Sequence, residues 1–379
     1  MESTVQIKFQ WVNKMKSIGI IGAGNFGTFL IESYKKIPGI KILAISSLDK
    51  KEILEKSKKY NIPHTFTNYK DLLQLKEIDI VAIPTPPFLH AQIIVDALKT
   101  NKHVVCEKPL ALSIEQTKKI KSFLKNQKLT INYVLRKNPL IKQIKKIINS
   151  KVLGNVQSFS FSNYASTSHL EKNHWFWDKK KSGGIWVEHG VHFFDLFSYL
   201  FEQNVKSIKS ISNSRPANKK IQDQVSCLCL YDKGILGKFE HSFSMPIQIE
   251  KTSFTIVFDK GYVNVEGWIP EKMQISAVLE KNKFNGLVAE IKNKEFEIKT
   301  TTSKLKEKII SRNSSYNSDF KTEIEIKTKK NKTQMYQQAV QEILQDLIKS
   351  IGTNKTPAIG FAEGVESLET ALMAEKASM

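Results

Sequence analysis

One stretch of the sequence places acid–base side chains where they could act together on a substrate. In SGGIWVEHGVHFFDLFSYL, residues 182–200, a helix would put Glu188, His192 and Asp195 at positions i, i+4 and i+7, on one face. A carboxylate beside an imidazole orients the ring and raises its basicity, which suits a general base near neutral pH. We therefore predict that His192 exchanges a hydroxyl proton while Glu188 or Asp195 orients its ring.

A second stretch, VVCEKPLALS at residues 104–113, sets Lys108 between Glu107 and Pro109. The apolar residues before it are typical of a buried parallel strand, and the proline ends that strand because it lacks a backbone N–H. Lys108 is thus expected at the carboxyl end of a strand, where ligands bind in open α/β sheets. Its ammonium group would there stabilise the alkoxide that develops as a hydride leaves.

Metal chemistry is the competing interpretation, because His189 and His192 stand three residues apart beside two carboxylates. The HExxH order is absent, however, and a helix would turn His189 about 100° away from Glu188. Cys227 and Cys229 would share one face of a strand, but no further soft ligand stands at a useful spacing. We predict no metal site.

A glycine-rich turn indicates a dinucleotide site, because it follows a predicted strand and opens a predicted helix. In such a turn the first glycine permits the tight bend, the second lets the backbone approach a pyrophosphate, and the third lets the helix pack on the strand. The helix N-terminus then attracts the phosphates. We predict cofactor contacts from Gly22, Gly24, Asn25, Phe26 and Gly27.

The end of the second predicted strand bears on the choice between NAD and NADP. The dinucleotide fingerprint expects an acid there for the ribose 2′-hydroxyl, but this strand ends in Ser46 and Ser47. Asp49 comes two positions later, and with Glu52 three residues on it has the pattern of a helix cap. Two serines with lysines beside them would tolerate a 2′-phosphate. The cofactor is therefore NAD or NADP, with a slight preference for NADP.

The elements that must position these residues form two regions with different patterns. Residues 16–135 alternate strands and helices, which predicts an α/β fold with a doubly wound parallel sheet, a Rossmann domain. From about Gly154 the pattern changes to short alternating strands preceded by one helix, Ile185 to Phe201. That pattern predicts an α+β domain on an open, mainly antiparallel sheet. Residues 300–334 are expected to be loop or edge strand.

This organisation predicts four segments. They are residues 1–14, a flexible or non-native extension; residues 15–137, the dinucleotide-binding domain; residues 138–334, a domain for substrate and oligomerisation; and residues 335–379, helices that pack back on the body.

Composition argues against several classes of protein. The net charge is +21, but arginine occurs only at Arg136, Arg215 and Arg312, and the lysines are scattered. Nucleic-acid readers rely heavily on arginine and on concentrated basic patches, so we expect no nucleic-acid partner. No apolar run is long enough to span a membrane, and the first residues lack a signal-peptide core. The low number of cysteines is also consistent with a cytoplasmic protein.

Four motifs in order, GAGNFG, IPTPPFLHA, CEKPLA and SGGIWVEHGVHFFD, make the chain resemble the glucose–fructose oxidoreductase and inositol dehydrogenase family (Gfo/Idh/MocA). The likeness continues through RKNP, LGNVQSF and the C-terminal stretch, and covers nearly the whole chain from Met15. It implies that the family's EKP lysine is Lys108, its catalytic histidine is His192, and its preceding acid is Glu188. Family members more often carry Asp at that last position.

The resemblance also implies further site residues. Thr85, Pro86 and His90 would line the nicotinamide side, together with Glu107 and Lys108 of the EKP motif. The second domain of the family often mediates dimers or tetramers, which predicts a homo-oligomer here.

Two residues outside the shared motifs are substrate candidates. Trp175 precedes the glycines of the histidine motif and would stack on a sugar ring or pack under its loop. Arg136 is a weaker candidate. Lys108, Glu188 and His192 would complete the substrate contacts.

These observations predict an NAD(P)-dependent oxidoreductase that acts on a CH–OH group of a sugar, cyclitol or sugar derivative. Two alternatives remain within the family: a regulator that binds the dinucleotide without catalysis, and a glycosidase that holds NAD⁺ and recycles it. Intact Lys108 and His192 argue against the regulator and leave the glycosidase open. The sequence does not decide the substrate or the direction of the reaction.

Overall fold

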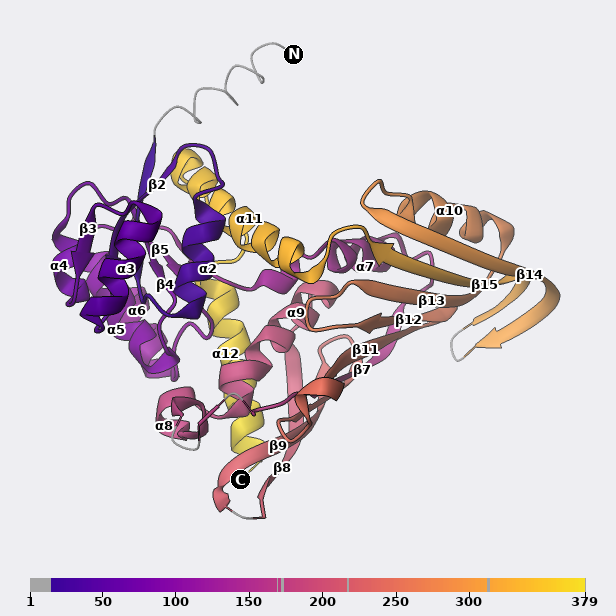
Figure 1. Cartoon of the computed structure of the whole chain (residues 1–379). Coiled ribbons are helices and arrows are strands. Elements are labelled where there is room, and N and C mark those ends of the chain that lie inside the picture. Colours follow the sequence, from indigo (N-terminus) through magenta and orange to yellow (C-terminus); the bar gives the residue numbers. More distant parts are fainter. Residues whose placement is uncertain (1–14, 169, 172–173, 217, 312–313, 379) are drawn as a thin grey trace, which may run out of the picture. The chain divides into compact units, whose positions relative to one another are not determined.

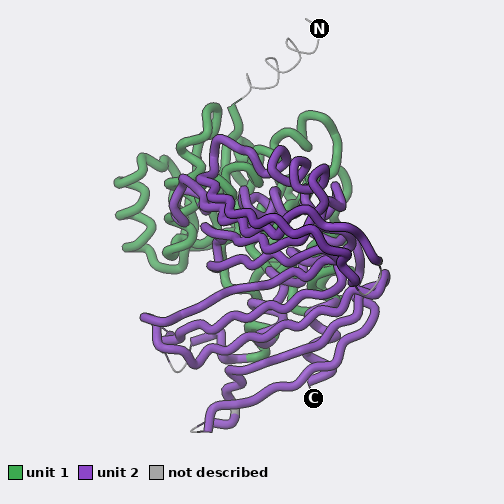
Figure 2. Tube along the Cα trace, turned by 90° about the vertical axis from the view of Figure 1, so that its right-hand side faces the viewer, with its two compact units in different colours: residues 1–134, 179–183, 337–369 green, residues 135–178, 184–336, 370–379 purple. Residues whose placement is uncertain are grey.

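The computed structural model describes residues 15–168, 170–171, 174–216, 218–311 and 314–378, so the predicted extension at residues 1–14 lies outside the described part. The chain forms two compact units (Figure 2). Unit 1 comprises the described part of residues 1–134 with 179–183 and 337–369, and unit 2 comprises 135–178, 184–336 and 370 onward. The sequence placed the division after residue 137. It also did not anticipate that residues 179–183 belong to unit 1, or that the C-terminal helices are divided between both units.

Unit 1 is built on six parallel strands in the order β3-β2-β1-β4-β5-β6 (Figure 1). This is the predicted doubly wound sheet, and its strand order reverses between β1 and β4, where such folds bind ligands. The strands are β1 (Lys16–Ile21), β2 (Ile40–Ser46), β3 (His64–Phe66), β4 (Ile80–Ile83), β5 (His103–Cys106) and β6 (Leu129–Ile131). All residues of β4 are buried, as expected for a strand covered on both faces.

Helices connect these strands, and the two caps that the sequence pattern predicts, Asp49 with Glu52 and Ser113 with Gln116, are confirmed. Asp49 accepts hydrogen bonds from the N–H groups of Lys51 and Glu52 at 2.9 and 3.0 Å, and Ser113 accepts one from Gln116 at 3.3 Å. The helices of unit 1 are α2 (Asn25–Tyr34), α3 (Lys50–Tyr60), α4 (Tyr69–Gln74), α5 (Pro87–Lys99), α6 (Ile114–Phe123) and α8 (Lys179–Ser182), with parts of α11 (Lys332–Thr353) and α12 (Phe361–Ala377).

Unit 2 is built on nine strands in the order β14-β15-β13-β12-β11-β7-β10-β9-β8. Every neighbouring pair is antiparallel except β7 with β10, so the predicted, mainly antiparallel sheet is confirmed. The strands are β7 (Val156–Tyr164), β8 (Val205–Arg215), β9 (Asn218–Tyr231), β10 (Leu236–Ser242), β11 (Lys251–Phe258), β12 (Gly261–Glu266), β13 (Lys272–Leu279), β14 (Phe296–Ser311) and β15 (Ser314–Thr328).

One face of this sheet packs on α9 (Val191–Phe201) through aromatic side chains (Figure 1). The ring of Phe193 lies 3.9 Å from that of Phe161, and the ring of Phe197 lies 3.9 Å from that of Phe159. The free cysteines Cys227 and Cys229 share a buried face as predicted. The alternate residues Leu228, Leu230 and Leu236 are exposed, so they line the opposite face of the sheet. Two further helices of unit 2 are α7 (Pro139–Ser150) and α10 (Lys281–Ile291).

Three elements differ from the sequence expectations. The lysine-rich residues 300–334 form most of a long hairpin, in which β14 is an edge strand and β15 lies inside the sheet. Ile324 and Ile326 alternate there into the core, a signal obscured by the charged residues between them. The apolar pattern predicts a strand from Leu129 to Leu135, but β6 ends at Ile131. The helix predicted from Ile185 begins with a π-helical turn, Trp186–Gly190. None of the described helices is both long and apolar enough to cross a membrane.

Candidate active site

The glycine-rich turn of unit 1 has the geometry that a bound dinucleotide needs. Gly22 has φ of +116°, and a Cβ there would lie 3.1 Å from the carbonyl oxygen of Pro84. A Cβ on Gly27 would overlap the carbonyl group of Gly22, so the helix can pack this closely only on glycine. A Cβ on Gly24 would meet nothing within 4 Å, which leaves the backbone open to a ligand. The three glycines therefore fit the three predicted roles.

Asn25 and Phe26 form the first turn of α2, directly after Gly24. The ring of Phe26 packs on that of Phe29, with centroids 5.6 Å apart. The first turn contains no acidic side chain, and the glycine at the N-cap has no side chain that could cap the helix. The N–H groups and the positive end of the helix dipole thus favour an anionic ligand at this turn.

The loop after β4 adds a polar atom beside the glycines. Thr85 packs close to Gly22, because its methyl carbon lies 3.2 Å from the position of a Cβ there. Its Oγ1 is buried and has no hydrogen-bond partner among the described residues. An orphaned hydroxyl beside an open glycine turn is consistent with a cofactor group at the switch point. Pro86 follows as the N-cap of α5.

His90 lies in the first turn of α5, directly after the loop that follows β4. Its ring is completely buried, so it does not line an open surface. Nδ1 lies 2.7 Å from the carbonyl oxygen of Pro109, and Nε2 lies 2.8 Å from that of Thr85. His90 therefore holds together the loops that follow β4 and β5, and it positions their residues.

Lys108 lies two residues after the end of β5 and is half-buried. The peptide bond between Lys108 and Pro109 is cis. The N–H of Glu107 donates to the carbonyl oxygen of Ile83 at 3.2 Å, and the Glu107 carboxylate accepts a hydrogen bond from Asn132. Asn132 is buried after β6 and was not identified from the sequence. These bonds fix the Lys108 segment at the same edge of the sheet as the glycine turn.

The predicted ribose end of the site contains Ser46, which is buried, and Ser47. The Ser47 hydroxyl donates to Glu52 at 3.2 Å, and the carbonyl oxygen of Ser46 accepts from the N–H of Gly22 at 2.8 Å. Lys56 joins this cluster, because its ammonium group donates to the Ala23 carbonyl and to Glu52 at 2.7 Å. The sequence did not single out Lys56, although it stands one helical turn after Glu52.

His192 belongs to unit 2, where it is the second residue of α9 and is buried. Its ring meets that of Trp268 edge to face, with centroids 5.2 Å apart, and Trp268 was not identified from the sequence. Glu188 lies in the preceding π-helical turn, and its N–H donates to Gly184 at 2.9 Å. Such turns inside helices occur frequently at functional sites.

Asp195 is paired with Arg136. The guanidinium group donates to both carboxylate oxygens, from Nε at 2.9 Å and from Nη2 at 2.6 Å, and it lies 5.0 Å from the ring centre of Tyr199. The predicted substrate residue Arg136 thus meets the predicted orienting residue Asp195. Glu188 thus lies in the π-helical turn, whereas His192 and Asp195 lie on α9.

Two further histidines, His189 and His241, lie near His192. Nδ1 of His189 and Nδ1 of His241 lie 3.2 Å apart, and the ring centres of His189 and His192 are 6.0 Å apart. Burial, and after it the neighbouring His189, hold the pKa of His241 well below its usual range. His241, from β10, therefore stays neutral. Among the described residues, no cluster of three or more histidine, cysteine, aspartate or glutamate side chains is placed to hold a metal.

Trp175 begins a 3₁₀ turn, Trp175–Trp177, and its ring lies 5.0 Å from that of His174. Its neighbours have other partners: Phe176 packs against Phe243, and Trp177 lies under the guanidinium of Arg215 at 4.4 Å.

The fold and the glycine turn define a dinucleotide-binding Rossmann unit joined to an antiparallel-sheet unit. Two family models match this chain: "Oxidoreductase family, NAD-binding Rossmann fold" over residues 16–134, and "GFO/IDH/MocA C-terminal domain" over residues 141–264. The chain belongs to the GFO/IDH/MocA oxidoreductase family.

The curated relatives have low sequence identity to this chain. The chain is 29% identical over 193 residues to the uncharacterized oxidoreductase YrbE of Bacillus subtilis, 27% over 214 residues to glucose-6-phosphate 3-dehydrogenase of the same species, and 25% over 202 residues to myo-inositol 2-dehydrogenase of Thermotoga maritima. These matches cover 50–54% of this chain and 55–60% of the relatives, so the chain spans little more than half their length.

Solved structures agree in fold over nearly the whole chain. Levoglucosan dehydrogenase in complex with NADH has a TM-score of 0.75 at 16% identity and covers 96% of both chains. Myo-inositol 2-dehydrogenase from Lactobacillus plantarum has a TM-score of 0.74 at 18% identity and covers 96% of this chain and 97% of its own.

Proposed function

We propose that the protein is an NAD(P)-dependent oxidoreductase that transfers a hydride between nicotinamide and a CH–OH carbon of a sugar, cyclitol or sugar derivative. The observation that carries this proposal is the arrangement of unit 1. Its open glycine turn, the orphaned hydroxyl of Thr85 and the segment of Lys108 share the carboxyl edge of one parallel sheet. The substrate class is supported by the names of relatives, which include a myo-inositol 2-dehydrogenase and a glucose-6-phosphate 3-dehydrogenase.

The reaction assigns a separate task to each residue. The bound dinucleotide supplies the hydride acceptor. His192 takes the proton of the reacting hydroxyl as general base, and Glu188 orients the imidazole. Lys108 places a positive charge at the same oxygen, where it stabilises the developing alkoxide. In the reverse direction Lys108 polarises the carbonyl group and His192 returns the proton.

The cofactor is proposed to be NAD or NADP, with a slight preference for NADP. Asp49 is engaged as a helix cap, and Glu52 is paired with Lys56. Ser47 and the exposed Lys50 and Lys51 would accept a 2′-phosphate more readily than an acid at the strand end would.

The direct test is absorbance of reduced nicotinamide, with NAD⁺ and NADP⁺ in turn, over a panel of sugars and inositols. Wild type is compared with Lys108→Met and with Lys125→Met, a matched change at an exposed lysine. The proposal predicts turnover by wild type and Lys125→Met that is lost in Lys108→Met. Tight cofactor binding without turnover by any variant would contradict it; glycoside cleavage would then indicate the redox-neutral glycosidase, and no reaction would indicate the regulator.

A further inference from the structure

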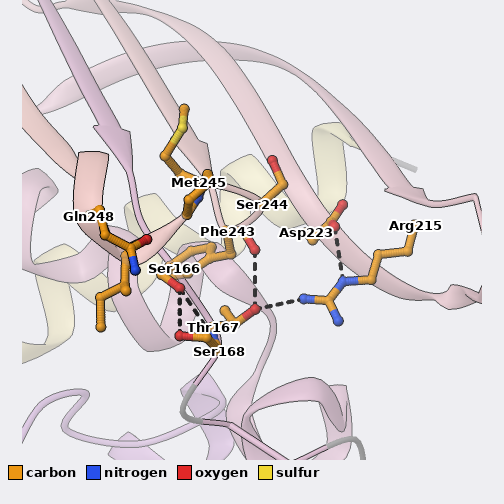
Figure 3. Close-up of a pocket in the computed structure, with 11 residues that line it drawn as sticks. Ser166, Thr167, Ser168, Arg215, Asp223, Phe243, Ser244, Met245 and Gln248 are labelled. Atoms are coloured by element: carbon orange, nitrogen blue, oxygen red, sulfur yellow. Dashed lines mark hydrogen bonds and ion pairs between the residues drawn. The ribbon is translucent and has the colours of Figure 1, made fainter.

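A pocket with polar and apolar lining lies at one edge of the nine-stranded sheet of unit 2 (Figure 3). Its volume is about 700 Å³. It is lined by the loop after β7, the end of β8, the beginning of β9 and the loop after β10. Because β7 and β10 are parallel and β9 is antiparallel to both β10 and β8, all four segments meet at the same edge. No catalytic residue proposed above lines this pocket.

A connected set of polar side chains forms the pocket wall, as Figure 3 shows. Arg215 donates from Nε to Asp223 at 3.0 Å and from Nη2 to the hydroxyl of Thr167 at 2.9 Å. On the same side, the hydroxyl of Ser166 donates to that of Ser168 at 3.0 Å. Hydroxyl groups and a carboxylate are the partners that sugar hydroxyls need, because each sugar hydroxyl both donates and accepts.

The charge of the pocket indicates what it would bind. Among the described residues that line it, the charged ones are Arg215 and Asp223, and they form an ion pair with each other. An anionic group would therefore meet a guanidinium that Asp223 already neutralises, and the ionic contact would add little to its binding. An uncharged, hydroxyl-rich group loses nothing by this pairing and gains oriented donors and acceptors.

The pocket adjoins the π-helical turn that precedes the proposed base. Phe243 lines the pocket, and its ring meets that of His189 at right angles with centroids 5.2 Å apart. His189 in turn lies 6.0 Å from His192 between ring centres. Two ring contacts within unit 2 thus connect the pocket wall to His192.

The size of the pocket agrees with such an occupant. Its volume lies within the range of about 300–1,000 Å³ that holds drug-sized ligands. A single free sugar or inositol that reacts at His192 would leave this volume to solvent.

We propose that this pocket binds a second, uncharged sugar ring of the substrate, so that the protein acts on glycosides of two or more rings. The assignment rests on the proposed oxidoreductase function. It makes Asp223, Arg215 and Thr167 specificity-determining residues that are remote from the reacting carbon.

The test compares neutral disaccharides (cellobiose, maltose, trehalose and sucrose) with glucose as substrates of wild type and Asp223→Asn. The exchange removes the charge that organises Arg215. We expect KM for the best disaccharide to rise about 10- to 100-fold. Its kcat, and both constants for glucose, should stay unchanged. Asp232→Asn is the matched control, because Asp232 is exposed in the turn at the opposite end of β9.

A second variant tests the pocket independently, in case Asp223→Asn fails to fold. Ser244→Leu fills the pocket from an exposed position and leaves the ion pair intact. It should raise the disaccharide KM in the same way. The proposal would be overturned if the variants raised KM equally for glucose and for disaccharides, or if neither variant changed KM. It would also be overturned if the pocket variants raised KM more for glucuronate or glucose 6-phosphate than for the neutral disaccharides.

Failure of the oxidoreductase function would appear differently, as absence of turnover with every sugar in wild type. The pocket is then tested by saturation-transfer NMR with the same disaccharides. Binding that Ser244→Leu abolishes would support the pocket assignment independently of activity, and absence of binding to wild type would overturn it.

Discussion

Both carboxylate oxygens of Asp195 accept hydrogen bonds from Arg136, at 2.6 and 2.9 Å. The carboxylate is buried, and the pair ties α9 to the segment that follows β6. We predict that Asp195→Ala lowers the free energy of unfolding by about 3 to 5 kcal/mol, because it leaves a largely buried guanidinium without its counter-charge. Glu188→Gln should instead lower kcat with little effect on stability. Urea denaturation of both variants checks this, and a fully stable Asp195→Ala would contradict it.

The glycine turn offers a matched pair of substitutions. Gly27→Ala should destabilise unit 1 by about 1 to 3 kcal/mol, because the new methyl group overlaps the carbonyl of Gly22. Gly24→Ala should leave thermal stability nearly unchanged, since nothing lies within 4 Å, and yet weaken dinucleotide binding at least tenfold. Thermal unfolding and calorimetric titration with NADP⁺ separate the two effects. Unchanged cofactor affinity in Gly24→Ala would argue against the proposed pyrophosphate position.

Acid should destabilise the protein through two histidines. Burial, and after it nearby Lys16, lower the pKa of His103 to about 4, and the pKa of His241 is lowered well below its usual range. Both rings are neutral in the folded protein, and unfolding lets them take up protons. Their contribution to stability is complete above pH ~6.5 and is lost as the pH falls toward the folded-state values.

The measurement is the free energy of unfolding between pH 7.5 and pH 4, at intervals of about half a unit. The buried His241 should contribute a slope approaching about 1.4 kcal/mol per pH unit. His241→Phe should flatten this slope, and His103→Gln should flatten it less because that ring is partly exposed. An equally steep curve in His241→Phe would contradict the assignment of a neutral buried ring.

We propose that the uncovered face of the nine-stranded sheet joins two copies of the chain. Leu228, Leu230 and Leu236 are exposed there on neighbouring strands, and Ile211 lies on the next strand. Exposed apolar side chains that gather on one sheet face are typical of an interface. Light scattering should give at least a dimer for wild type and a monomer for Leu228→Glu with Leu236→Glu. A monomeric wild type would contradict this proposal.

Local signals in the sequence predicted much of unit 1. The glycine spacing, the Asp49 and Ser113 caps and the strand that ends before Lys108 each depend on residues close together in the chain. The same holds for Cys227 and Cys229, whose alternation alone predicted a shared face. These features follow from backbone geometry and need no knowledge of distant partners.

Features that depend on distant partners could not be predicted in this way. The Arg136–Asp195 pair joins positions 59 residues apart, and His189 meets His241 across 52 residues. Trp268 reaches His192 only because the sheet returns beneath α9. The pocket of unit 2 needs four segments between residues 166 and 248, so its chemistry is not visible in any one motif.

The central claim is that Lys108 and His192 serve the same chemical step. A double-mutant cycle on kcat/KM tests it, with Lys108→Met, His192→Asn, the double variant and His64→Asn as an exposed control. The account predicts that each single change lowers kcat/KM by about 10²- to 10⁴-fold and that the double variant is little worse than either. Near-normal turnover by His192→Asn, or losses that simply multiply, would contradict it.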